Sequence, residues 1–237
     1  MYKKKHALKR LASIVTTLAL LILSPLHAET EKVPLHKNEE KALTAHPIVK
    51  MNTSKGEIII KLYPEKAPKS VENFLSYVQD DFYSNTLIHR VVDGFLIQGG
   101  GFATGYNEKK TKKPIRNESQ TALANKRGTI GFALTTNPHS AASQFYINTT
   151  DNPELNVKPS KKYGFTAFGE IIEGMNVIDK IKKEPVSKRL VYSAMYKRKV
   201  TLHHTPNEDI IINSIDILRP LQSTSLPSAS RTDTGTD

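Results

Sequence analysis

The chain has 237 residues, of which 38% are hydrophobic, and this is enough to form one large domain or two small ones around a core. Cysteine is absent, which excludes disulfides, a thiol nucleophile and cysteine-based metal sites. The formal net charge of +11 raises the question of nucleic-acid binding. We do not favour that class, because the lysine-rich stretch 109–113 has no interleaved aromatic residues on which bases could stack.

The first 28 residues have the layout of a signal peptide. Five basic residues precede an apolar run over 11–23, and the small residue Ala28 ends the segment. The run of about 13 residues is too short to span a bilayer comfortably. Removing residues 1–28 takes away five basic and no acidic residues, so the net charge falls from +11 to +6. Leu26 departs from the small residue usual at its position, which leaves an uncleaved membrane anchor as the alternative.

The next segments predict a flexible lead, a hairpin and a helix. Residues 29–46 are charged and without periodicity, so we expect them to form a flexible N-terminal segment. Strands are predicted over 48–53 and 57–63, on either side of a short turn. A helix is predicted over 67–78, because apolar residues recur at i, i+3, i+4 and i+7, namely Val71, Phe74, Leu75 and Val78.

Residues 87–102 stand out because polar side chains lie inside an apolar stretch. Arg90 sits in the middle of a predicted strand, Gln98 follows, and three glycines come next at 99–101. Strand alternation would place Arg90 on the face that carries Ile88 and Val92. An arginine in such a place often binds something, although an edge-strand arginine whose head reaches water is the simpler alternative.

The remaining chain predicts further short strands and one more helix. Residues 99–127 form a long polar loop, which is typical of a functional or surface-wrapping segment. A second helix is indicated by Met175, Val177, Ile178 and Ile181. The segment 184–206 is basic and irregular, and we assign it no structure. Further strands are predicted over 128–134, 144–148, 163–170 and 210–218, the last buried on both faces, and a disordered tail over 220–237.

This pattern predicts a mainly β domain over 47–219. About eight strands and two helices occur without β-α-β alternation, which favours an antiparallel barrel or sandwich.

Several kinds of catalytic or binding site are not indicated by the sequence. The histidines do not cluster at ligand spacing, so we expect no metal, and the glycines at 99–101 and 105 miss the phosphate-binding fingerprints. No nucleophile elbow is present. A cation, an amide and apolar side chains remain, which could bind an extended peptide and bias its backbone.

Three long motifs then carry a resemblance to a known family. They are IHRVVDGFLIQGGGF, RGTIGFALTTNPHSAASQFYIN and YGFTAFGEIIEGMNVID. With these, residues 47 to about 219 resemble cyclophilins, the prolyl cis–trans isomerases, and in particular the exported bacterial type. The resemblance implies a closed eight-stranded antiparallel barrel capped by two helices, with an active groove on its outer face.

The resemblance also implies roles for individual residues. Arg90, Phe95 and Gln98 correspond to catalytic positions, with Arg90 as the essential arginine and Gln98 bonded to the substrate backbone. Ala133 and Leu134 would pair with the peptide main chain, and Gln144 would lie on the pocket floor. The hydrophobic pocket for the proline ring would comprise Phe95, Leu96, Phe132, Tyr146 and Leu155, with Phe165 as a further substrate-binding residue.

Some positions depart from the family pattern. Tyr146 replaces the commoner phenylalanine, which we expect to be tolerated if its hydroxyl reaches water. Glu154 stands where the family has an aromatic residue, often tryptophan, and Phe165 where many members have histidine. We therefore expect weak or no inhibition by cyclosporin.

These residues lead to an expected function without cofactor or metal. A guanidinium that bonds the prolyl nitrogen would ease rotation of an X–Pro bond, because that nitrogen recovers its lone pair as the amide twists. We expect a monomeric periplasmic isomerase that acts on proline-containing unfolded or extended polypeptides of exported proteins. It should neither bind nucleic acid nor stay inserted in the membrane after signal cleavage. The alternative is a peptide-binding module or holdase with little turnover.

Overall fold

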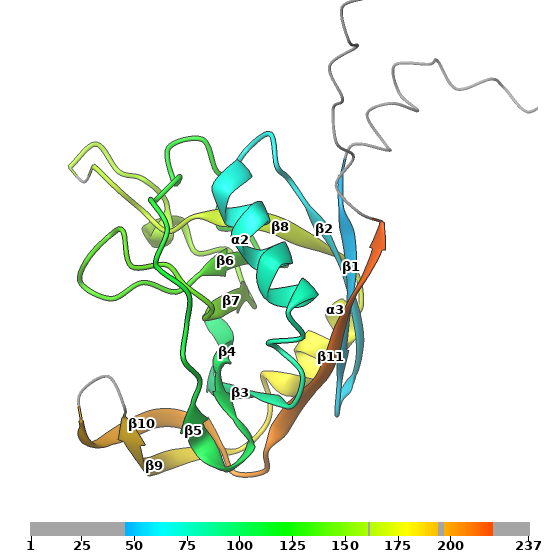
Figure 1. Ribbon diagram of the computed structural model, residues 1–237, viewed down its shortest axis with the longest axis vertical. Coiled ribbons are helices and arrows are strands. Elements are labelled where there is room, and N and C mark those ends of the chain that lie inside the picture. The colour runs from blue at the N-terminus through cyan, green and yellow to red at the C-terminus, as the bar shows by residue number, and fades with distance from the viewer. Residues whose placement is uncertain (1–45, 161, 194–196, 220–237) are drawn as a thin grey trace, which may run out of the picture. The chain divides into compact units, whose positions relative to one another are not determined.

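The computed structural model describes residues 46–160, 162–193 and 197–219 (Figure 1). The predicted signal peptide, nearly all of the segment 29–46 and the tail 220–237 lie outside these residues. Nothing in the described ranges is a helix of the length and hydrophobicity needed to cross a bilayer.

The domain is a closed antiparallel barrel of eight strands. The strands follow one another in the order β3-β11-β1-β2-β8-β6-β7-β4, and pairing of β4 with β3 closes the barrel. A two-residue strand, β5 (Asn107–Glu108), adds to β4 outside the closed ring. The mainly β fold predicted from the sequence is thus confirmed. The barrel strands are β1 (Ile48–Thr53), β2 (Gly56–Leu62), β3 (Thr86–Val92), β4 (Leu96–Ala103), β6 (Thr129–Phe132), β7 (Phe145–Asn148), β8 (Ala167–Glu173) and β11 (Ile210–Arg219).

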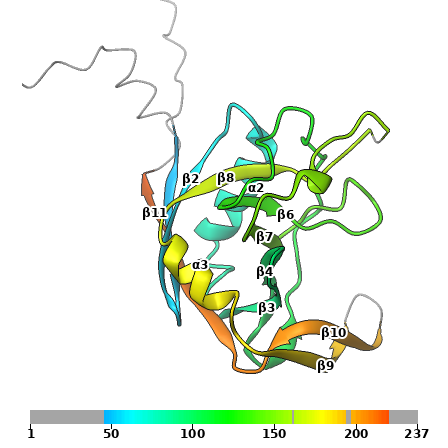
Figure 2. The same cartoon turned by 180° about the vertical axis from the view of Figure 1, so that it is seen from behind.

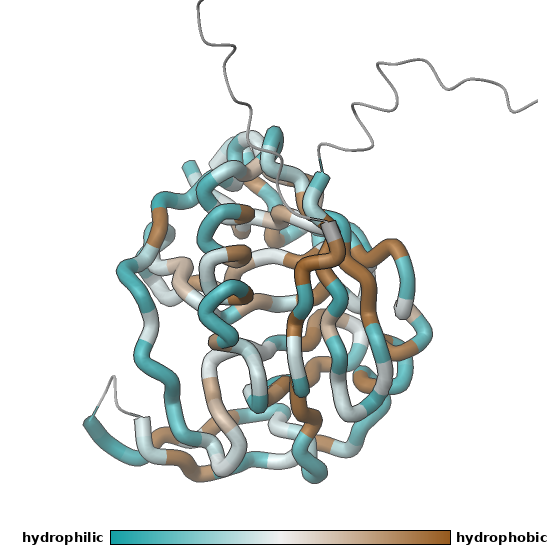
Figure 3. Tube along the Cα trace, turned by 45° about the vertical axis from the view of Figure 1, so that its right-hand side comes forward, coloured by the Kyte–Doolittle hydropathy of each residue, from teal (hydrophilic) through white to brown (hydrophobic). Residues whose placement is uncertain are grey.

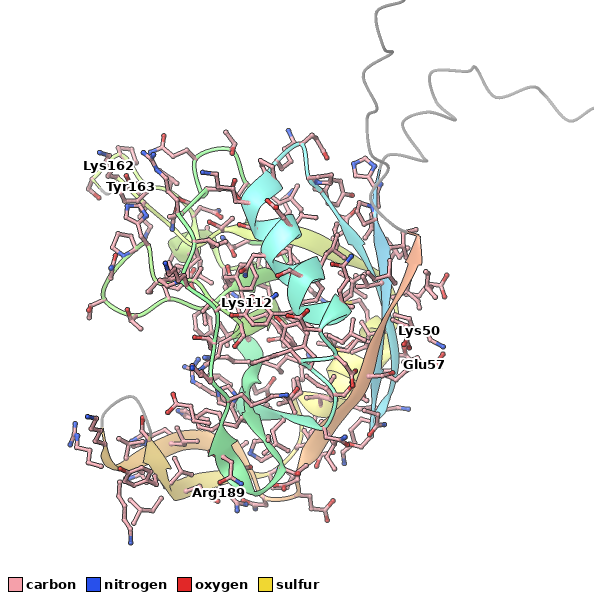
Figure 4. All side chains as sticks on the ribbon, in the orientation of Figure 1. Lys50, Glu57, Lys112, Lys162, Tyr163 and Arg189 are labelled. Atoms are coloured by element: carbon pink, nitrogen blue, oxygen red, sulfur yellow. The ribbon has the colours of Figure 1, made fainter. Side chains whose placement is uncertain are left out.

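The alternation of side chains along β1 and β2 explains why this segment forms a hairpin against the core. Val49 and Met51 of β1 are fully buried, whereas Lys50 between them is partly exposed. Lys50 pairs with Glu57 across the hairpin at 3.4 Å on the outer face, where Figure 4 labels both. Figure 3 shows hydrophobic and hydrophilic residues following one another along these strands.

Two helices close the barrel from opposite sides. Helix α2 (Pro68–Gln79) lies in front in Figure 1, and helix α3 (Met175–Ile181) comes forward in Figure 2. The apolar face predicted for α2 packs in the barrel core together with Val177, Ile178 and Ile181 of α3. The first turn of α2 begins at a proline, and its free amides are bonded by Glu118 from the long loop, at 3.0 Å from Lys69 N and 2.9 Å from Ser70 N.

The segment 184–206, which we left unassigned, forms a β-hairpin. Strands β9 (Val186–Ser193) and β10 (Arg198–Pro206) pair with each other as a separate two-stranded sheet. Its apolar pattern is short and interrupted by charged residues, so the sequence alone does not indicate the two strands. Val191 is buried and, with the partly buried Val200 and Leu202, packs against a cluster that includes Phe102 of β4.

The last strand differs from the prediction that both of its faces are buried. Ile210, Ile212 and Ile215 face the core, whereas Asp216 and Leu218 are exposed. Because β11 is part of a barrel, only its inner face meets the core. The strand predicted over 163–170 likewise begins later, at Ala167, and ends at Glu173.

Candidate functional site

Arg90 lies on β3 at a β-bulge. Ile88 pairs with Gly99 of β4, whereas Arg90 pairs with the next residue of that strand, Gln98. His89 is therefore an additional residue on β3 that has no counterpart on β4. A bulge of this kind bends the strand and re-aims the side chains that follow it.

The bulge changes the face on which Arg90 lies. Ile88 and Val91 both belong to the barrel core, three positions apart, so the alternation of the strand is interrupted between them. The sequence analysis placed Arg90 on the same face as Ile88, and this is wrong because of the bulge. Arg90 is half-buried outside the core cluster.

Three long polar side chains form a row on the outer face, which we call the polar row: Arg90, Gln98 and Gln144. Arg90 Nη1 donates to Gln98 Oε1 at 3.3 Å, and Gln98 Nε2 donates to Gln144 Oε1 at 2.9 Å. No ion pair in the described part of the chain includes Arg90. Burial lowers the pKa of Arg90 from its usual value. The guanidinium is thus bonded by one neutral amide, and no carboxylate of the described residues forms an ion pair with it.

Glycines make room for this row. A side chain at Gly101 would place its Cβ 2.6 Å from the Gln144 side chain, so Gln144 can lie over β4 only because residue 101 is glycine. Gly100 has a φ of +77°, and a Cβ there would lie 2.7 Å from the Tyr83 ring. The close packing of side chains against β4 therefore explains two of the three consecutive glycines.

An apolar cluster lies next to the polar row, and we call it the apolar pocket. It joins the nearly buried Leu96, Tyr146 and Leu155 with the partly buried Phe95 and Phe165. Tyr146 pairs with Gln98 across β7 and β4, which fixes the pocket beside the row. The structure thus brings together four of the five residues that the resemblance placed around a proline ring, and adds Phe165, which was expected as a further substrate-binding residue. Glu154, just before Leu155, is exposed.

Phe132 does not lie with these residues. It is fully buried in the barrel core, where its ring stacks on Phe168 at a centroid distance of 4.6 Å. The neighbouring Ala133 and Leu134 do line a cavity beside the polar row, and the Ala133 amide donates to the Gln144 carbonyl at 2.9 Å. The sequence motif includes both positions, but strand alternation sends Phe132 inward.

The hydroxyl of Tyr146 does not reach water. Tyr146 is 2% exposed, and its hydroxyl donates to Asn125 Oδ1. Burial raises the pKa of Tyr146 well above its usual value. Asn148 Nδ2 also donates to Asn125 Oδ1 at 3.2 Å and to Thr129 Oγ1 at 2.8 Å. The sequence analysis missed this buried amide network behind the pocket, because Asn125 is distant in sequence and lies in a loop.

His89, the bulged residue, was also missed as part of the site. It is 4% exposed and packs edge-to-face on Phe102 at 4.8 Å. Burial, with a smaller contribution from the Arg90 charge, lowers the pKa of His89 to about 4. The imidazole is therefore neutral near pH 7 and extends the apolar surface beneath Arg90.

The side chains of the site supply a cation, two amides and an apolar surface. No group of three His, Asp or Glu side chains suited to hold a metal occurs within 46–160, 162–193 and 197–219. A fixed cation beside an apolar pocket can bind an extended, partly apolar polypeptide and stabilise partial negative charge on it. The fold and the site thus define a β-barrel protein with a cation beside an apolar pocket on its outer face.

Comparisons with known proteins give the family. A family model described as cyclophilin type peptidyl-prolyl cis-trans isomerase/CLD matches residues 48–216. The chain is 43% identical over 172 residues to peptidyl-prolyl cis-trans isomerase B of Escherichia coli (strain K12), covering 72% of this chain and 99% of the relative. It is 37% identical over 209 residues to peptidyl-prolyl cis-trans isomerase A of Dickeya dadantii (strain 3937), covering 88% of this chain and 97% of the relative.

A solved structure agrees with the fold. A cyclophilin type isomerase of Cryptosporidium parvum, crystallised in the presence of the dipeptide Ala-Pro, has a TM-score of 0.56 and 25% identity, covering 72% of this chain and 98% of that chain. The chain therefore belongs to the cyclophilin family and is a peptidyl-prolyl cis–trans isomerase.

Proposed function

We propose that the protein accelerates rotation of X–Pro bonds by a hydrogen bond from the Arg90 guanidinium to the prolyl nitrogen. The proline ring occupies the apolar pocket, next to the polar row. The observation that carries this proposal is the position of Arg90. The bulge brings it to the outer face beside the pocket, and only Gln98 bonds its side chain among the described residues.

The physical basis is a difference in binding between two states of the amide. Rotation about a peptide bond has a barrier of roughly 18–20 kcal/mol, because the C–N bond has partial double-bond character. In the twisted state the nitrogen regains its lone pair and accepts a hydrogen bond that the planar amide accepts poorly. A donor placed at that nitrogen stabilises the twisted state more than the ground state and so raises the rate.

The other members of the site orient and shield that hydrogen bond. Gln98 accepts from Arg90 and is itself bonded to Gln144, so the guanidinium is held before substrate binds. The apolar pocket excludes water, which strengthens an electrostatic contact. In this proposal Gln98 also bonds a carbonyl of the substrate, and Ala133 and Leu134 pair with its backbone.

The substrates proposed are unfolded or extended polypeptides that contain proline. The presence of the Ala-Pro dipeptide in the crystal of the Cryptosporidium parvum relative supports this class. We propose further that the protein is monomeric and assists the folding of exported proteins in the periplasm. The support for export is the sequence of residues 1–28, with its basic start, apolar run and small final residue.

The test of the mechanism is the cis–trans exchange rate of an Ala-Pro peptide, measured by NMR with the wild-type protein and with Arg90→Ala. Wild-type protein should accelerate exchange, and the variant should lose about 100-fold or more of that effect. Equal acceleration by both proteins would contradict the role of Arg90. Binding of the peptide without acceleration by wild type would instead favour a holdase.

Export is tested by cell fractionation with N-terminal sequencing. A protein that is retained in the cytoplasm with residue 1 intact would contradict export.

A further inference from the structure

A cavity extends from the polar row to the β9–β10 hairpin. Its volume is about 790 Å³. On the barrel side it is lined by the polar row and by Ala133 and Leu134, and on the hairpin side by Ser193 and four consecutive residues of β10, 200–203. No residue of the apolar pocket lines it. The cavity therefore leads away from the pocket, toward chain that lies outside an X–Pro unit bound there.

The hairpin is a fixed wall of this cavity. Val191 is 7% exposed and packs with Leu87, Phe102 and Tyr106 of the barrel side. The guanidinium of Arg189, labelled near the bottom of Figure 4, lies 4.3 Å from the centre of the Tyr106 ring. At the base of the hairpin, the Asn207 amide donates to the Pro185 carbonyl at 2.9 Å. A peptide in the cavity would therefore meet a surface that is already in place.

One edge of this wall can receive a polypeptide backbone. Among the described strands, β10 pairs only with β9, so its other edge belongs to no sheet. Residues 200–203 of β10 line the cavity. The edge of a strand offers amide and carbonyl groups to an extended chain whatever its side chains are.

The charge of the wall selects among such chains. Residues 186–206 contain five basic side chains and no acidic one, namely Lys188, Arg189, Lys197, Arg198 and Lys199. None of the five lines the cavity, to which the hairpin contributes Ser193 and residues 200–203, so their charge acts on a bound chain from beside the cavity. Among the residues that line the cavity, Arg90, Lys109 and Lys110 are basic and Glu108 is the one carboxylate. Together with the basic residues that do line it, the five hairpin residues favour acidic side chains on that chain.

We infer that the β9–β10 hairpin is a specificity element, and that the cavity takes an acidic stretch of polypeptide flanking the X–Pro unit. This inference rests on the proposed function, because the cavity begins at Arg90. It adds a preference that the barrel residues alone do not supply: the pocket and polar row act on the X–Pro unit, and the hairpin acts on the sequence next to it.

The experiment compares kcat/KM, measured by NMR exchange, on Ala-Pro peptides flanked on either side by Glu-Glu, Gln-Gln or Lys-Lys. The wild-type protein should favour the Glu peptide over the Gln peptide about tenfold at low salt, on one side of the proline, and the preference should fall as salt is raised. Lys110→Glu/Lys199→Glu should remove the preference. Lys66→Glu/Lys69→Glu makes the same change of charge on exposed lysines near the start of α2, which belong neither to the cavity lining nor to the hairpin, and should keep it.

The outcomes separate this inference from the proposed function. If the Gln peptide is not turned over at all, the proposed function fails. If it is turned over but the three peptides are turned over equally, the inference is overturned. Loss of the preference in both charge variants would overturn it too, because net charge rather than the hairpin would then be responsible.

Discussion

The barrel side and the hairpin side of the cavity are built in different ways. The barrel side presents buried or half-buried side chains from β3, β4 and β7, each bonded to or packed on a neighbour. The hairpin side presents exposed basic residues on a two-stranded sheet outside the barrel. Rotation of an amide needs a donor fixed to within a fraction of an ångström, and the barrel provides that. Selection by charge acts over longer distances and does not require the basic side chains of the hairpin to touch the substrate.

The comparison would be broken most strongly if His89, which lies between the two sides, were charged at neutral pH. Its pKa of about 4 is depressed by burial, so the unfolded chain, with a pKa near 6.5, binds the proton first as pH falls. The stabilisation is complete above pH 6.5 and is lost as the pH falls toward 4. The free energy of unfolding should drop by about 2 kcal/mol between pH 7 and pH 5 through this group.

Urea unfolding at both pH values measures this change. His89→Gln, which cannot take up a proton in this range, should show a correspondingly smaller difference between pH 7 and pH 5. The same difference in both proteins would mean that His89 is accessible to protons in the folded state.

Gly101→Ala sharpens the comparison on the barrel side. The new Cβ would meet the Gln144 side chain at 2.6 Å, so Gln144 must move and its bond with Gln98 is lost. We expect kcat/KM on an Ala-Pro peptide to fall about tenfold, since Arg90 loses part of its support. The ratio of rates on acidic and neutral peptides should stay as in the wild type. A change in that ratio would show that the polar row and the hairpin do not act separately.

Tyr146→Phe removes the hydroxyl that joins the apolar pocket to Asn125, and it should have the smallest effect of the variants, on stability. Asn125 Oδ1 would lose the tyrosine hydroxyl but keep Asn148 Nδ2 as a donor at 3.2 Å. The free energy of unfolding should fall by about 1 kcal/mol, the typical contribution of one hydrogen bond. Urea unfolding decides this. An unchanged or increased stability would mean that the buried hydroxyl does not stabilise the fold, as expected if its bond to Asn125 did not form.

The sequence predicted most of the strands and both helices because their apolar residues recur with the periods of strand and helix, and the resemblance to the family decided for a barrel rather than a sandwich. Through the resemblance to the family it also predicted Arg90, Gln98, four pocket residues and Phe165, which the structure brings together. It could not predict the bulge at His89, because apolar residues occupy both phases of the two-residue period around it, as in Leu87-Ile88 and Val91-Val92, so the shift of phase cannot be recognised. Phe132 was misplaced for a related reason: a motif does not say which face of a strand each member occupies.

The rest escaped prediction because it depends on contacts between distant segments. The bond between Tyr146 and Asn125 joins a strand to a loop that no local pattern describes. The hairpin at 186–206 has few apolar residues of its own, and it folds against Phe102 and Tyr106, far earlier in the chain. Its apolar pattern is too short to be read without that surface.

The central claim is that Arg90 acts on the twisted amide rather than on binding. Arg90→Lys tests it most directly, because lysine keeps the charge but lacks the planar fork of donors. NMR exchange gives kcat on an Ala-Pro peptide, and titration followed by NMR gives its Kd. We predict that kcat falls about 100-fold while Kd changes by less than about threefold. A Kd weakened about 100-fold with kcat unchanged would contradict the account and make Arg90 a binding residue.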